Sequence, residues 1–241
     1  MTMERLDKYL SSRGAGSRKE VQRLIKSGAV TVDGAVCKQT DNKIDPDSAD
    51  VAVNGQAVGE KLVYIMLNKP AGVVSATEDS RDKTVIDILP DDLKRRGLFP
   101  AGRLDKDTEG LLIITNDGEL AHRMLSPKKH VEKTYVATLD GEITEDAIHK
   151  FEQGVIFADG YKCMPAKLKI GENGDKTVGI VTIFEGKYHQ VKRMFASCGL
   201  KVVHLKRISI GNLYLDSKLP IGEAKSLTNL EILRVFIGNI H

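Results

Sequence analysis

Tryptophan is absent from this chain of 241 residues, and aromatic residues make up only 5% of it. A protein that binds single strands mainly on rows of aromatic rings needs more of them, so that design is disfavoured. Cysteine is also scarce, and an odd number of widely spaced residues indicates neither a disulfide framework nor a CxxC metal pair. We expect Cys37, Cys163 and Cys198 to be reduced thiols, as in cytosolic proteins.

Long hydrophobic runs are missing as well. No stretch approaches the ~20 apolar residues that cross a bilayer, and the charged start MTMERLDKYL does not resemble a signal peptide. Apolar residues at 41% and charged residues at 29% are typical of soluble globular proteins. We therefore expect a soluble, cytoplasmic protein without a membrane partner.

The net charge of +3 is too small to indicate a partner, but the charges are unevenly distributed. Residues 1–38 hold eight Lys or Arg against four acids, and residues 186–207 hold six and no acid. Two basic segments separated by acidic stretches fit a phosphate-binding surface. Each segment alone fits a solvated helix face equally well.

The first 60 residues predict a small unit of two helices and a hairpin. Leu6, Tyr9 and Leu10 recur at helical spacing, and Ser17 with Glu20 forms a capping box that should start a second helix at Arg18. That helix should end near Lys26 and present its basic residues outward. The following Asp33-Gly34 pair is the strongest short hairpin signal. We place the domain boundary at Gly59-Glu60-Lys61.

A second domain, residues 61–241, contains both strands and helices. Apolar runs predict strands at 63–67, 111–114, 135–139, 178–184 and 201–205, and helical patterns fall near 119–125, 144–153 and 189–198. The two types do not alternate regularly. This order favours an α+β fold with a mainly antiparallel sheet.

Chemically interesting side chains are densest between Gly102 and Gly110, a charged loop that runs directly into the strand at 111–114. Polar loops beside a rigid scaffold often hold catalytic groups. The pattern alone nevertheless favours a simpler interpretation, in which Asp105 and Asp107 cap turns. Residue spacing cannot decide between the two.

Three blocks in the same order carry a family resemblance. The run GRLDKDTEGLLIITNDGELAHRMLSP, the block EKTY at 132–135 and the block EGKYHQVKRMFA at 185–196 resemble pseudouridine synthases related to the ribosomal small-subunit enzyme A. Residues 1–60 resemble the RNA-binding module of ribosomal small-subunit protein four. The resemblance implies an isomerase that converts a specific uridine of ribosomal RNA to pseudouridine. It also implies a helix-helix-hairpin module joined to a catalytic domain with a mixed, mainly antiparallel sheet.

The same resemblance assigns catalytic roles to three residues. Asp105 corresponds to the essential aspartate and Tyr135 to the active-site tyrosine, which would stack on the base and assist proton removal. Lys192 stands where many relatives have arginine, so the charge is kept but the bidentate fork is lost. A cation about 4 Å from Asp105 would favour its ionised form by about 4 kcal/mol at an effective dielectric near 20. The alternatives are a phosphate contact for Lys192 and an ordinary strand tyrosine for Tyr135.

The implied reaction is an isomerisation, in which a carbon–nitrogen bond breaks and the base rejoins the sugar through ring carbon five. Nothing is oxidised or added, so we expect neither a redox cofactor nor a metal. The target base has to leave its stack to reach Asp105. Arg103 would fill the vacated space or hold a phosphate, although a structural arginine is an equal alternative. The mechanism gives His189 and His204 no proton-transfer role.

RNA affinity is expected to come largely from the basic helices of the N-terminal unit. The predicted phosphate contacts are Arg13, Arg18, Lys19 and Arg23. Contacts of this kind provide affinity and register with little base specificity.

The third block also indicates which ribosomal RNA is the target. Its Tyr188-His189 pair resembles the small-subunit enzyme, whereas large-subunit relatives typically show asparagine and arginine there. We therefore expect a monomer that acts on small-subunit ribosomal RNA or on its assembly intermediate. A large-subunit enzyme, a ribosome-assembly factor without activity and a uracil-releasing glycosidase remain as alternatives.

Overall fold

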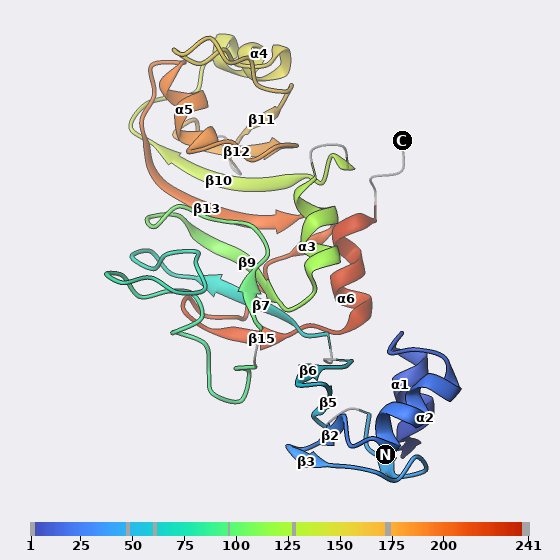
Figure 1. Ribbon diagram of the computed structural model, residues 1–241. Helices are drawn as coiled ribbons and strands as arrows, with labels where there is room; N and C mark the ends of the chain where they lie inside the picture. Colours follow the sequence, from blue (N-terminus) through green and yellow to red (C-terminus); the bar gives the residue numbers. More distant parts are fainter. Residues whose placement is uncertain are drawn as a thin grey trace. The chain divides into compact units, whose positions relative to one another are not determined.

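The computed structural model describes residues 3–46, 49–59, 62–95, 97–126, 129–171 and 175–237 (Figure 1). The chain divides into two compact units, Met1–Leu62 and Val63–His241. Glu60 and Lys61, at the predicted boundary, lie outside the described residues.

The N-terminal unit contains both predicted helices. α1 (Leu6–Ser12) is followed by α2 (Arg18–Lys26), and the predicted capping box of Ser17 and Glu20 closes the start of α2. Val21 and Ile25 are fully buried on the inner face of α2, where they pack in a small core with residues of α1. Burial of this stripe leaves the basic residues of α2 in solvent.

The predicted hairpin is also confirmed. β2 (Val30–Val32) pairs with β3 (Ala35–Val36), and Asp33 and Gly34 both have the positive φ that a tight hairpin turn requires. A second turn of the same kind connects β5 (Val51–Val53) to β6 (Gln56–Ala57), giving the sheet order β3-β2-β5-β6. β1 (Glu4–Arg5) pairs separately with β4 (Lys43–Ile44).

The C-terminal unit is built on one sheet in the order β11-β12-β10-β13-β9-β7-β15, with β8 beside β9 and β14 beside β13. Among the described strands, only β13 and β9 are parallel neighbours. The predicted α+β fold with a mixed, mainly antiparallel sheet is therefore confirmed. The strands are β7 (Tyr64–Lys69), β8 (Phe99–Pro100), β9 (Glu109–Thr115), β10 (Lys133–Leu139), β11 (Lys167–Ile170), β12 (Val178–Ile183), β13 (Val202–Ile210), β14 (Leu213–Tyr214) and β15 (Ala224–Ser226).

Helices cover both faces of this sheet. α4 (Glu145–Gln153) and α5 (Gln190–Ala196) contribute to one core, whereas α3 (Gly118–Leu125) and α6 (Asn229–Leu233) lie side by side over a second core (Figure 1). β7 feeds Ile65 and Leu67 into the first core and Tyr64 and Met66 into the second. Because β7 and β9 are buried on both faces, their sequences are continuous apolar runs without alternation.

The structure differs from the predicted elements in a few places. β13 extends to Ile210, well beyond the predicted end at 205, because Arg207 points into the protein and pairs with β10. β11, β15 and the short α6 were not predicted, since they have too few residues to show a period. The three cysteines are free, and no described helix has the length and apolarity to cross a membrane.

Gly110 explains how two strands meet beside the charged loop. It has a φ of +101°, and a Cβ atom there would lie 2.2 Å from the backbone oxygen of Arg207. No side chain fits such a close approach. Glycine is thus required where β9 starts its parallel pairing with β13.

Candidate active site

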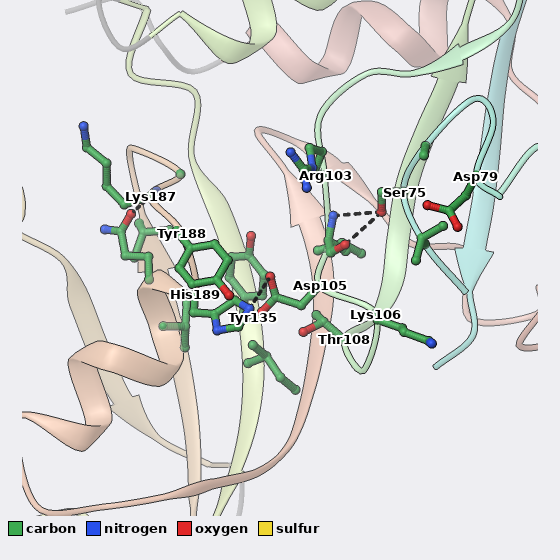
Figure 2. Close-up of a pocket in the computed structure, with 18 residues that line it drawn as sticks. Ser75, Asp79, Arg103, Asp105, Lys106, Thr108, Tyr135, Lys187, Tyr188 and His189 are labelled. Carbon is green, nitrogen blue, oxygen red and sulfur yellow. Dashed lines mark hydrogen bonds and ion pairs between the residues drawn. The ribbon is translucent and has the colours of Figure 1, made fainter. Parts of the chain in front are cut away.

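A cavity of about 710 Å³ opens in the C-terminal unit where the loop before β9 faces the turn before α5. Its walls include Asp105, Tyr135, His189, Arg103 and Ser75. Figure 2 shows Asp105 and Tyr135 between Arg103 and Ser75 on one side and Tyr188 and His189 on the other. The size is that of a pocket for a small ligand.

The loop that carries Asp105 is held by its backbone. Ser75 Oγ accepts a hydrogen bond from the amide of Leu104 at 3.0 Å and donates one to the Leu104 carbonyl at 2.9 Å (Figure 2). Within the loop, the amide of Thr108 donates to the carbonyl of Asp105. These bonds fix the residues on both sides of the carboxylate, as a preorganised site requires.

Lys69, at the end of β7, lies beneath this loop and is completely buried. Its ammonium nitrogen lies within hydrogen-bonding distance of four backbone carbonyl oxygens, those of Pro70, Asp105, Lys106 and Thr108, which share its three N–H donors. Burial lowers the pKa of Lys69 from 10.5 to about 8, and the nearby carboxylates of the loop oppose that shift. Lys69 was not predicted as part of the site, although a lysine at the end of an apolar strand and directly before proline was a usable signal.

Replacing Lys69 with methionine should impair both the loop and the fold. We expect a loss of about 1–3 kcal/mol in unfolding free energy, because buried carbonyls lose their donor, and at least a tenfold loss in kcat. Between pH 8 and 10.5 the unfolded chain holds a proton that folded Lys69 has released, so stability should rise with pH there. The free energy of unfolding of the variant, measured with urea at several pH values across that range, should therefore rise less than that of the parent protein.

The matched control is Lys133→Met. Lys133 lies on β10 and is buried, and its ammonium donates to the carbonyl of Val131 instead of to the loop that carries Asp105. Burial, with a smaller contribution from the charge of Arg207, lowers the pKa of Lys133 to about 8. This variant should lose stability but keep the kcat of its folded fraction. Equal kcat losses in both variants would contradict a specific role for Lys69.

Lys192 of α5 brings a positive charge to the loop. Its ammonium nitrogen lies 3.0 Å from Oδ2 of Asp105 and 2.5 Å from Oδ1 of Asp107. Burial lowers the pKa of Lys192, but the hydrogen bonds with Asp107 and Asp105 outweigh burial and leave that pKa above its ordinary value. The hydrogen bond with Lys192 also lowers the pKa of Asp107. Lys192 therefore stays charged at neutral pH.

The two carboxylates differ in their surroundings. The side chain of Asp105 is 26% exposed inside the cavity, whereas that of Asp107 is 74% exposed. Nε2 of His189 lies 3.6 Å from Oδ1 of Asp105, beyond hydrogen-bonding distance. The carboxylate that faces the cavity is thus that of Asp105, held from one side by a shared cation.

Tyr135, on β10, is a buried residue on the wall of the cavity, opposite Arg207 of β13. The guanidinium of Arg207 donates to the Tyr135 hydroxyl at 3.4 Å and to the Leu111 carbonyl at 2.8 Å. Its Nη2 has no hydrogen-bond partner among the described residues. A buried guanidinium therefore donates a hydrogen bond to the oxygen of Tyr135 in the wall of the cavity.

The basic segment at 186–207 is therefore not one phosphate-binding surface, and that interpretation was wrong. Arg207 is only 3% exposed, and Lys192 is paired with carboxylates. Arg193 binds Asp159 and lies over the ring of Phe157. The sequence showed the charges but not the direction of the side chains.

The remaining predicted residues are exposed. Arg103 lines the cavity and forms no ion pair with any residue in the described ranges. In the N-terminal unit the predicted phosphate contacts are all exposed at or after α1 and along α2, namely Arg13, Arg18, Lys19 and Arg23. His204 lies outside the cavity wall and binds Glu109 at 2.9 Å.

Comparison with known proteins finds matches to two family models and to a solved structure. Residues 63–197 match the family model of RNA pseudouridylate synthase, and residues 4–48 match that of the S4 domain. A solved structure described as a pseudouridylate synthase superposes with a TM-score of 0.67 at 36% identity, covering 96% of this chain and 99% of that one.

Several curated proteins are similar over nearly their whole length. An uncharacterized RNA pseudouridine synthase of Bacillus subtilis is 52% identical, covering 95% of this chain and 96% of the relative. The ribosomal small subunit pseudouridine synthase A of Yersinia pestis is 42% identical, with 96% and 97% covered. The ribosomal large subunit pseudouridine synthase B of Bacillus subtilis is 39% identical, with 97% and 96% covered. The predicted resemblance is thereby confirmed, and the chain belongs to the RNA pseudouridylate synthase family and carries an S4 domain.

Proposed function

We propose that this protein converts a uridine of small-subunit ribosomal RNA to pseudouridine, with Asp105 as the catalytic carboxylate. The observation that carries the proposal is the 3.0 Å contact between Lys192 and Asp105 on the wall of a ligand-sized cavity that also contains Tyr135. The contact places a positive charge against the carboxylate of Asp105, whose side chain is only 26% exposed. An ionised carboxylate is what nucleophilic attack on the sugar or the base requires.

The proposed reaction has four steps. The bond between ring nitrogen one and the sugar breaks, the base turns, and ring carbon five bonds to the sugar and then releases its proton. Asp105 bonds to the sugar or to the base as the carbon–nitrogen bond breaks, and that bond to Asp105 breaks again when ring carbon five bonds to the sugar. Tyr135 stacks on the base, and its oxygen gives a proton to ring nitrogen one and then accepts the proton of carbon five. Arg207 supports the second role because its guanidinium meets the tyrosine hydroxyl.

Tyr135→Phe separates stacking from proton removal. The variant keeps the ring and should bind RNA within about twofold of the parent protein, because the stacking surface is unchanged. Without the hydroxyl, we expect turnover to fall by about 10²–10⁴, the usual contribution of a positioned base. Tritium release from RNA labelled at uracil carbon five measures the step, and unchanged release would exclude the hydroxyl from it.

If the N-terminal unit binds RNA phosphates, the RNA affinity should depend on the salt concentration. In Arg18→Ala/Arg23→Ala, two exposed cations of α2 are removed. The slope of log affinity against log salt should fall by about two, because each phosphate contact contributes about one. Filter binding from low to physiological salt measures this slope, and a slope equal to the parent's would remove α2 from the RNA interface. The kcat at saturating RNA should not change.

Small-subunit RNA is the proposed target because relatives named for that RNA are similar to this chain along nearly their whole length. Large-subunit RNA is the second candidate, since one relative of comparable identity has that name. The protein should be incubated with unmodified transcripts of both RNAs, and pseudouridine mapped by carbodiimide-dependent primer-extension stops. A new stop in the small-subunit transcript supports the proposal, and a stop only in the large-subunit transcript replaces it. An abasic site indicates a glycosidase, and unchanged RNA indicates an assembly factor.

A further inference from the structure

Tyr188 is an exposed aromatic residue on the wall of the cavity that holds Asp105. It is 75% exposed, and its ring stacks on His189 with centroids 3.8 Å apart and planes 17° apart. A ring that stacks on one side and remains so exposed presents its other face to solvent (Figure 2). A ring that is this exposed buries little apolar surface and contributes little to the stability of the fold. Stability therefore does not explain why an aromatic residue stands at this position.

The turn that presents Tyr188 is held by buried side chains. Glu185 is buried and accepts hydrogen bonds from the amide of Met164 and from the side-chain nitrogen of Gln190. The side-chain oxygen of Gln190 in turn accepts from the amide of Lys187 at 2.8 Å. Both ends of the turn are therefore tied to one buried network. An aromatic ring that is already positioned loses little conformational freedom when a ligand stacks on it.

His189 connects this ring to the catalytic carboxylate. Its backbone has a left-handed φ of 49°, and its Nε2 lies 3.6 Å from Asp105. Tyr188 stacks on the same imidazole. Counted outward from Asp105, the imidazole is the first ring and Tyr188 is the second, and the outer face of Tyr188 is free. Arg103 is exposed on the wall of the same cavity and adds a positive charge there, whereas the ammonium of Lys187 lies over the ring of Tyr161.

We infer that Tyr188 is a stacking platform for an unpaired nucleobase that flanks the uridine in the cavity. The inference rests on the proposed function, because extrusion of the target uridine requires that its neighbours lose their stacking partner. An aromatic ring replaces that partner for any base, since every base has a π-face. RNA-binding proteins commonly recognise unstacked bases of loops and bulges in this way.

Tryptophan at position 188 gives a direct test, because the chain has no tryptophan of its own. Tyr188→Trp in the full chain is titrated with fluorescein-labelled hexauridylate at low salt. An equally labelled strand of six abasic ribose phosphates, with the same charge and no bases, is titrated in parallel. The matched control is Tyr214→Trp, which replaces a tyrosine that is 63% exposed and outside the cavity wall.

We expect hexauridylate to quench the emission of Tyr188→Trp and to leave that of Tyr214→Trp unchanged, whereas the abasic strand quenches neither. Binding of hexauridylate, seen by anisotropy, without quenching at 188 would overturn the inference. Equal quenching by the abasic strand, equal quenching at 214, or no binding of hexauridylate would overturn it too. The emission does not depend on turnover, so a failure of the proposed function is detected separately with the transcript assay.

Two further variants test the ring itself. Tyr188→Ala should weaken hexauridylate binding about tenfold, and Tyr188→Phe should restore it to within about twofold of the parent protein. A merely structural ring would show the opposite pattern, with altered thermal unfolding and unaltered affinity. Equal affinities of the alanine and phenylalanine variants would contradict stacking.

Discussion

Asp105→Asn is expected to abolish pseudouridine formation. The amide has nearly the same shape as the carboxylate but carries no charge and is a poor nucleophile, so turnover should fall by at least about 10³. RNA affinity should stay within about threefold, since phosphate contacts dominate binding. Single-turnover tritium release measures the rate, and filter binding measures the affinity.

Asp107→Asn is the matched control for this variant. It makes the same chemical change two residues away, on the other carboxylate bound by Lys192. Because the side chain of Asp107 is 74% exposed, we expect less than a tenfold loss of turnover. A parental rate in Asp105→Asn, or equal losses in the two variants, would refute the assignment of the catalytic carboxylate.

Lys192→Met should also abolish turnover while RNA binding remains nearly intact. The substitution keeps most of the side-chain volume but removes the cation 3.0 Å from Asp105 and leaves two acidic side chains without their shared partner. Since both side chains of the pair are about a quarter exposed or less, solvent only partly replaces that charge. We expect kcat to fall by at least about 10² in the transcript assay.

Lys192→Arg distinguishes the charge from the shape of the side chain. Arginine keeps the cation and adds a planar fork, so turnover should recover to within about tenfold of the parent protein. Turnover retained by Lys192→Met would show that Asp105 does not depend on this charge. A large loss of RNA affinity in that variant would instead favour a phosphate contact.

Much of the N-terminal unit could be predicted because its signals are local. The capping box of Ser17 and Glu20 and the turn at Asp33-Gly34 are satisfied by residues a few positions apart, and both occur as predicted. β7 and β9 were recognised as strands from continuous apolar runs. Gly110 shows the limit of local signals, because its necessity depends on a strand almost 100 residues away.

The family, the types of most elements and the three residues proposed for catalysis could be predicted from the amino-acid sequence, because ordered motifs and short-range periodicity carry that information. The partners of those three residues became visible only in the folded chain. In the sequence, Lys69 and Arg207 are two among many basic residues. In the folded protein, buried Lys69 donates to carbonyls of the loop that carries Asp105, and buried Arg207 donates to Tyr135. Charge partners and burial depend on which distant strands become neighbours, and no local pattern records that choice.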